Sequence, residues 1–214
     1  MEELDDAVRR SGASAYLLYA SSADADMRYL THFVTSDPVP YIRKGGHRGL
    51  IVVSQMEYAR AVQESSAEAI TRADAGYLEH LEKEGDPWKA LARTIAGLVE
   101  GDVLVPPTFP FALAQALQAS RRVLLDSGTV ASMRAKKSGE EIARITAAQR
   151  AAESAIDYAV SLIRASVPRR GILHRDGAPL TSERVRHAMH RLLLEQGYQA
   201  SETIVSCGRD TAIP

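Results

Sequence analysis

The sequence predicts an α/β fold, with a layered amino-terminal domain over residues 1–130 and the beginning of a second domain over residues 131–214. Between residues 14 and 126, short apolar runs alternate with helical patterns, which favours layers of strands and helices over a bundle of helices. The pattern then changes. Ser138 and Glu141 have the spacing of a capping box, which marks the start of a long helix. This change in periodicity places the domain junction just before that helix.

Short apolar runs between turn-forming residues predict the strands of the first domain. They are Ala15–Tyr19, Gly49–Val53, Ala69–Ala73, Val103–Val105 and Val123–Leu125. Helical periodicity predicts three helices, Met56–Ser65, Pro87–Val99 and Phe111–Ala119. Asp86 is a suitable cap for the second helix because its carboxylate accepts hydrogen bonds from the first turn, where Pro87 loses nothing by lacking an N–H.

The stretch Tyr29–His47 contains Pro38, Pro40, Gly45 and Gly46, and we predict a long loop here. Long loops in compact domains often carry function, whereas a surface connector is the simpler interpretation.

The second domain is predicted to open with a long amphipathic helix that begins at the capping box. Its apolar residues recur at spacings of three, four or seven and form one stripe, namely Ile142, Ile145, Ala152, Ile156, Ala159 and Ile163. Pro168 forbids continuation of the helix, so we predict a loop over Pro168–Pro179.

A second amphipathic helix is predicted after this loop, with Thr181 or Ser182 as its cap and Gly197 as its stop. One face of this helix carries Val185, Ala188, Met189, Leu192 and Leu193. The extended run Glu202–Cys207 is then expected to be the first strand of a sheet that is mostly absent from the chain.

Composition limits the classes of partner. The 26 Lys and Arg residues balance 27 Asp and Glu residues, so a formal charge of -1 gives no general attraction for nucleic acid or acidic lipid. No apolar run is long enough to span a bilayer, and the acidic start is unlike a signal peptide, so we expect a cytoplasmic protein without nucleic-acid or membrane partners. Cys207, the single cysteine, excludes a disulfide framework, and we expect a buried, reduced thiol.

Several residues are of types that could form a site, but a simpler interpretation accounts for each. His187 and His190 share a helix face, but no Glu completes a zinc-binding pattern, and a solvated surface is expected. Asp24, Asp26 and Asp37 are better explained by turns than by acid–base chemistry. Ser206 and Cys207 lack the Gly-x-Ser-x-Gly pattern that places a nucleophile on a sharp turn. The Gly45–Gly46 pair does not have the spacing of a phosphate-binding loop. Residue chemistry alone therefore assigns no catalytic, cofactor-binding or metal-binding residue.

Three segments, in the correct order, resemble the Xaa-Pro peptidase family, the prolidase, aminopeptidase P and creatinase or pita-bread group. Met27–Phe33 is similar to the family's Asn-Ile-Arg-Tyr-Leu-Thr-Gly-Phe, with His32 in place of the Gly. Met133–Ile142 is similar to the junction Leu-Arg-x-Ile-Lys-Ser-Pro-Glu-Glu-Ile, with Gly139 in place of the Pro. Thr203–Pro214 is similar to Thr-Ile-Val-Ala-Ser-Gly-x-Asn-Ser-Ala-Leu-Pro, which a substrate-pocket His follows in the family.

This resemblance implies a ribonuclease-H-like creatinase amino-terminal domain, followed by the first helices and strand of a pita-bread α+β catalytic domain. It implies hydrolysis of the peptide bond before proline by two divalent ions, manganese or cobalt, whose Asp, His and Glu ligands all lie downstream of this chain. No residue of this chain is therefore expected to be a metal ligand, and no metal is expected in this chain alone. Only Ile213 and Pro214 are expected at the edge of the substrate pocket.

The resemblance also implies a proline-containing peptide as substrate and a homodimer, with the Pro38–His47 segment as the feature that would reach across to the partner. Two alternatives stay open from sequence. One is a catalytically inactive, peptidase-like binding protein, and the other is a creatinase-type amidinohydrolase.

Overall fold

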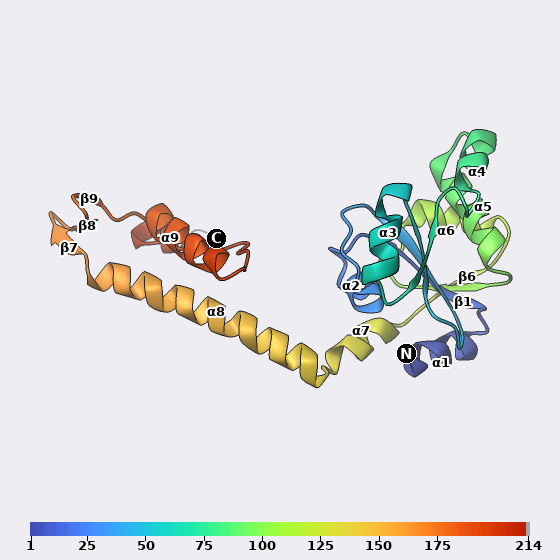
Figure 1. The fold of residues 1–214 in the computed structure, drawn as a ribbon, viewed down its shortest axis with the longest axis horizontal. Helices are drawn as coiled ribbons and strands as arrows, with labels where there is room; N and C mark the ends of the chain where they lie inside the picture. The colour runs from blue at the N-terminus through green and yellow to red at the C-terminus, as the bar shows by residue number, and fades with distance from the viewer. Residues whose placement is uncertain (213–214) are drawn as a thin grey trace. The chain divides into compact units, whose positions relative to one another are not determined.

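The structure, a computed structural model, describes residues 1–212 and divides into two compact units, Met1–Lys136 and Lys137–Pro214 (Figure 1). The first unit ends later than the expected boundary at residue 130. The reason is the helix α7 (Thr129–Ala135), whose Val130 and Met133 are buried in the core of the first unit.

A six-stranded mixed sheet forms the centre of the first unit, in the order β4-β3-β2-β1-β5-β6. Its strands are β1 (Ala15–Ala20), β2 (Val39–Lys44), β3 (Leu50–Val53), β4 (Glu68–Thr71), β5 (Val103–Val105) and β6 (Val123–Leu125). β2 pairs antiparallel with both β1 and β3, whereas the β3–β4, β1–β5 and β5–β6 pairs are parallel. The five strands other than β2 therefore share one direction, and their carboxyl ends lie at one edge of the sheet.

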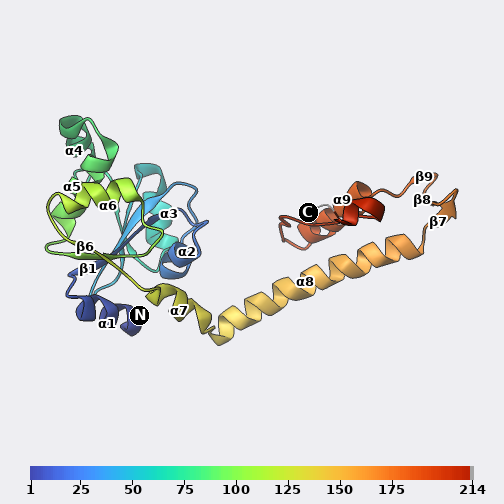
Figure 2. The ribbon, with the colours of Figure 1, turned by 180° about the vertical axis from the view of Figure 1, so that it is seen from behind.

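Helices cover both faces of this sheet. The first face carries α1 (Glu2–Ser11), α2 (Ala25–Thr31), α3 (Gln55–Glu64) and α7, which contribute to one apolar cluster. The second face carries α4 (Tyr77–Glu84), α5 (Pro87–Leu98) and α6 (Phe111–Gln118), which pack in another. Figures 1 and 2 show α3 in front of the sheet from one side and α5 and α6 in front of it from the other. The predicted α/β layers are confirmed, although α1, α2, α4 and α7 were not predicted.

The predicted single long loop over Tyr29–His47 is wrong, because the end of α2 and the strand β2 lie within it. Pro40 pairs with Tyr19 of β1 but lies outside the two residues of β2 that pair with β3, so its missing N–H costs no bond on that side. Two stretches of the predicted loop are irregular, namely residues 32–38 between α2 and β2 and the exposed turn after Lys44 that connects the β2–β3 hairpin. Most of the Pro38–His47 segment is thus the strand β2, and its exposed part is the hairpin turn over residues 45–47, so a contact of this turn with a partner stays a prediction.

Capping side chains fix several helix starts. Asp86 accepts hydrogen bonds from the backbone N–H groups of Trp88 and Lys89, which confirms its predicted role. Asp24 caps α2 in the same way, and His32 ends that helix with a φ of 54°. Glycine adopts this left-handed conformation most easily, which explains why the similar family segment has Gly at the position of His32.

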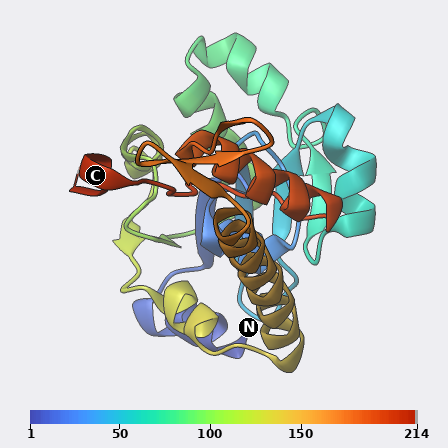
Figure 3. The same cartoon turned by 90° about the vertical axis from the view of Figure 1, so that its left-hand side faces the viewer.

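The second unit consists of α8 (Gly139–Arg164), a small antiparallel sheet and α9 (Ser182–Glu195), followed by a short 3₁₀ helix over Gly208–Ala212. Figure 3, in which this end of the unit faces the viewer, shows the strands in orange near the carboxyl end of α8. They are β7 (Val167–Arg169), β8 (Ile172–Arg175) and β9 (Ala178–Pro179). The predicted loop over Pro168–Pro179 is thus wrong, because it folds into three short paired strands. The capping box of Ser138 and Glu141 is confirmed, as are the Thr181 cap and the stop at Gly197.

The apolar stripe predicted on α8 does not face its partner. The buried residues of α8 are Ala151, Ala155, Ala159 and Leu162, and only Ala159 belongs to the predicted stripe. α9 packs on this narrow, alanine-rich face, which leaves the four isoleucines of the stripe about half exposed. On α9, Val185 is buried and the other residues of the predicted face are half-buried.

The segment Glu202–Cys207 is not a strand, because it pairs with no other strand among residues 1–212. Cys207 is an exposed free thiol, which corrects the prediction of a buried one.

Candidate functional site

A pocket of about 130 Å³ opens at the carboxyl edge of the sheet, on the face covered by α4 and α5. Tyr19 comes from the end of β1, Arg72 follows β4, Tyr77 begins α4, and Trp88 lies in the first turn of α5. Apolar side chains complete the walls, including Pro40, Val52 and Leu91. Ligands of open α/β sheets commonly bind outside the carboxyl ends of the strands, so the pocket lies where this architecture places sites.

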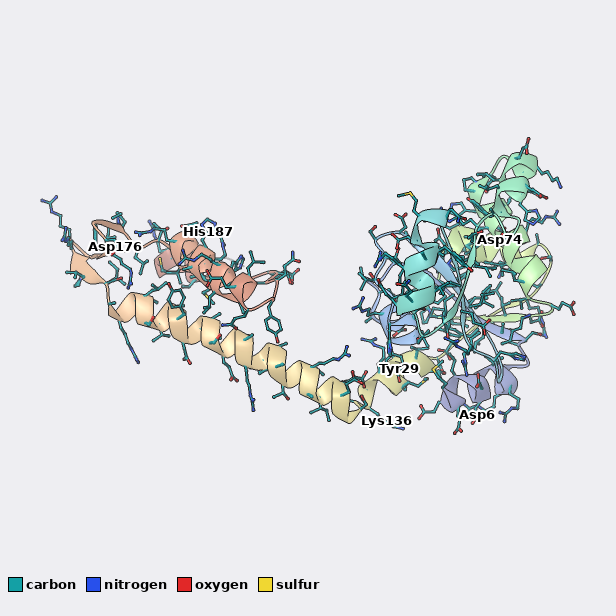
Figure 4. All side chains as sticks on the ribbon, viewed as in Figure 1. Asp6, Tyr29, Asp74, Lys136, Asp176 and His187 are labelled. Atoms are coloured by element: carbon teal, nitrogen blue, oxygen red, sulfur yellow. The ribbon has the colours of Figure 1, made fainter. Side chains whose placement is uncertain are left out.

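Local hydrogen bonds fix the position of Arg72. Its backbone N–H donates to the Val53 carbonyl over 2.8 Å, and the Tyr77 N–H donates to the Arg72 carbonyl over 2.9 Å. In the connection to α4, the Thr71 hydroxyl donates a hydrogen bond of 2.7 Å to the carboxylate of Asp74 (Figure 4). The turn that carries Arg72 is therefore braced by its own backbone and side chains.

The chemistry of the pocket combines aromatic rings with one cation. The guanidinium carbon of Arg72 lies 6.0 Å from the centre of the Tyr77 ring, and the rings of Tyr19 and Trp88 meet edge to face at 5.8 Å. Burial raises the pKa of Tyr19, while the charge of Arg72 opposes that rise. Tyr19 therefore stays protonated at neutral pH, and Arg72 supplies the positive charge.

A larger groove of about 490 Å³ lies between α5 and α6, but most of its charged groups are already engaged. Arg93 pairs with Glu84 over 3.1 Å, Asp86 caps α5, and Arg121 donates to the Val99 carbonyl over 2.8 Å. The smaller pocket is the better candidate because its cation is not used in this way.

The structure does not bring the candidate residues named from the sequence together into a site. His187 is exposed on α9 (Figure 4), while His190 is half-buried with its Nε2 2.8 Å from the Thr203 hydroxyl. Asp24 is a helix cap, and Asp26 pairs with Arg134 over 2.8 Å. These contacts are structural.

Two further predictions concern the end of the chain and the membrane. The expected edge of the substrate pocket, Ile213 and Pro214, lies outside the described residues. Within residues 1–212, no helix has both the length and the apolar character required to cross a bilayer.

A family model described as the creatinase/prolidase N-terminal domain matches residues 1–136, more than half of the chain. The chain belongs to this family. No curated protein matches the chain.

Solved structures that resemble this creatinase/prolidase N-terminal domain and the unit after it are peptidases. They include the Xaa-Pro dipeptidase from Bacillus anthracis, with a TM-score of 0.67 and 16% identity, covering 91% of this chain and 48% of that one. The X-Pro aminopeptidase from Thermotoga maritima has a TM-score of 0.63 and 19% identity, covering 89% of this chain and 49% of that one. The prolidase from Pyrococcus horikoshii has a TM-score of 0.61 and 14% identity, covering 91% and 48%. The chain spans about half the length of these proteins, and at these identities the likeness shows a shared fold.

The metal pair implied by the family does not fit the residues present. Among residues 1–212, no group of three or more His, Cys, Asp or Glu side chains is arranged to hold a metal ion.

Sequence analysis missed the residues of the pocket in this creatinase/prolidase N-terminal domain. Arg72 falls inside the predicted strand Ala69–Ala73, whereas the observed strand ends at Thr71. A charged residue at the carboxyl end of an apolar strand was the available signal for a site. Trp88 gave a second signal, because it is the one tryptophan of the chain and directly follows the capped start of α5.

Proposed function

We propose that this chain is the amino-terminal part of a metal-dependent Xaa-Pro peptidase, which hydrolyses the peptide bond before proline. The observation that carries the proposal is the extent of the structural similarity. Residues 1–136 make up about 64% of the 214 residues, since 136/214 is 0.64, yet the likeness to the Xaa-Pro dipeptidase covers 91% of the chain. The similarity thus continues past the amino-terminal domain into the second unit.

In this proposal the two units have different roles. The first unit is an amino-terminal domain of the creatinase/prolidase type, and the second begins the catalytic domain. The ligands of the two divalent ions, manganese or cobalt, belong to sequence that follows residue 214. Oxygen-rich ligand sets suit manganese, and paired ions both activate water and polarise a carbonyl. The complete protein is proposed to be a cytoplasmic homodimer.

The test compares two proteins, residues 1–214 and the product of the complete reading frame. Each is incubated with Mn²⁺ or Co²⁺ and a Xaa-Pro dipeptide, with a Xaa-Ala dipeptide as the matched control substrate. We expect the complete protein to release proline and to leave the Xaa-Ala peptide intact, and we expect no turnover by residues 1–214. A complete protein without turnover, or one that hydrolyses creatine instead, contradicts the proposal, and so does turnover by residues 1–214 above a metal-only blank.

A further inference from the structure

The half-buried pocket at the carboxyl edge of the sheet has a size that selects its occupant. A dry cavity of about 150 Å³ in another protein holds a benzene molecule. The present pocket, at about 130 Å³, thus matches one ring of five or six heavy atoms, and a larger body would extend into solvent. Trp88 is 36% exposed, so the mouth of the pocket is open to such an extension.

The charge of the pocket selects an anion. Arg72 is the one charged residue among the side chains that line the pocket, and no carboxylate is among them. Other arginines of the same unit pair with carboxylates, such as Arg43 with Asp5 and Arg122 with Asp102. Within residues 1–212, the half-buried guanidinium of Arg72 makes no hydrogen bond and no ion pair, so its donors are available.

The geometry of a guanidinium favours a carboxylate among the anions of this size. Its N–H groups form a planar fork that donates two parallel hydrogen bonds to the two oxygens of one carboxylate. The cation–π contact with Tyr77 limits the orientations of that fork. The rings of Tyr19 and Trp88 beside it offer apolar and aromatic surface for a ring.

From this size, charge and aromatic lining, we propose that the pocket binds a small carboxylate attached to a single five- or six-membered ring, with the carboxylate on Arg72 and the ring against Tyr19 and Trp88. The shared chemistry admits two sources, a free ring-bearing acid or the carboxyl terminus of a peptide that ends in a cyclic residue. The pocket lies wholly within the first unit, so the inference does not depend on the proposed peptidase activity.

Trp88 provides a reporter, because it is the one tryptophan in the chain and lines the pocket. The experiment titrates residues 1–214 with cyclohexanecarboxylate and follows Trp88 fluorescence. Cyclohexanecarboxamide keeps the ring without the charge, and acetate keeps the charge without the ring. We expect each of these two probes to bind at least about tenfold more weakly, since a hydrogen bond to a charged group and a buried ring each contribute that much to affinity.

Two variants of the cation test its role. Arg72→Met should weaken cyclohexanecarboxylate binding by about tenfold to a hundredfold, and Arg72→Lys, which keeps the charge but loses the fork, should lie between. Arg10→Met is the matched control, since Arg10 is exposed on α1 and lines no part of the pocket. The emission spectrum and thermal midpoint of each variant establish that the domain stays folded.

The source is resolved by titration with Ala-Pro and with Ala-Pro amide. Tighter binding of Ala-Pro than of cyclohexanecarboxylate, lost in the amide, supports a peptide terminus, whereas weaker binding supports a free acid. The proposal is overturned if cyclohexanecarboxamide binds as well as the acid, if folded Arg72→Met binds normally, or if no probe changes Trp88 emission at millimolar concentration.

Discussion

Replacement of Gly49 by alanine should destabilise the first unit by about 2 kcal/mol, because the new methyl group would meet a buried ring. Gly49 is buried at the base of the β2–β3 hairpin, where a Cβ would lie 2.5 Å from the hydroxyl oxygen of Tyr41 and 2.6 Å from its Cζ. Optimal contacts between such atoms are about 3.5 Å, so the ring would have to move by about 1 Å. Tyr41 is 1% exposed and packed in the first cluster, so little room exists for that movement.

The assay is thermal unfolding of residues 1–214 followed by Trp88 fluorescence, which reports on the first unit. For a unit of 136 residues, unfolding entropy scales to about 0.29 kcal/mol/K, so 2 kcal/mol lowers the midpoint by about 7 °C. Gly45→Ala is the matched control in the same hairpin, because nothing lies within 4 Å of its Cβ. We expect that change to be neutral or slightly stabilising. Midpoints for the two variants within about 2 °C of each other would refute the argument from Tyr41.

Two further predictions concern charge and packing. The side chain of Arg43 is 10% exposed, and its Nε and Nη2 each contact the carboxylate of Asp5 over 2.8 Å. Asp5→Asn removes that carboxylate and should lower the free energy of unfolding in urea by about 3 kcal/mol. Asp6→Asn, at an exposed ion pair, is the control and should lower it by under about 0.5 kcal/mol. The hydrogen bond from Arg43 lowers the pKa of Asp5, so this stabilisation is present above the usual value of 3.8 and is lost as pH falls below it; equal acid sensitivity of wild type and Asp5→Asn contradicts this. In the second unit, Leu162 is 6% exposed and Ile145 is 55% exposed. Leu162→Ala should therefore lower the free energy of unfolding, followed by circular dichroism, by about 2 to 3 kcal/mol, and Ile145→Ala by under about 1 kcal/mol. Similar losses for the two variants would show that α9 does not pack as described.

Features that depend on neighbours in sequence were predictable. The caps at Asp86, Ser138 and Thr181 each involve bonds to residues two or three positions away, and all three form. The five strands predicted in the first unit were also correct, apart from their ends. Capping residues and apolar runs therefore predict where helices and strands lie along the chain, but they do not predict which other elements each one contacts.

Features that depend on distant partners were not predictable in the same way. Pro40 indicates a loop by its chemistry, yet the register with β1 and β3 makes it part of a central strand. On α8, the larger isoleucines form the more apolar stripe, but the partner helix covers the alanines instead. The pocket joins Tyr19, Arg72 and Trp88 from three separate elements, so no local pattern contains it.

The pairing of β5 with β1 has a consequence for the order of assembly during synthesis. β1, β2, β3 and β4 pair in succession within residues 15–71, whereas β1 gains its other neighbour only when Val103 and Leu104 arrive. Translation adds about 5 to 20 residues per second, so residues 72–102 take on the order of a few seconds to appear. During that interval β1 presents a row of unpaired N–H and C=O groups, which is a template for any extended segment nearby. The nascent chain is therefore most exposed to wrong pairing, with itself or with a neighbouring nascent chain, along this one edge.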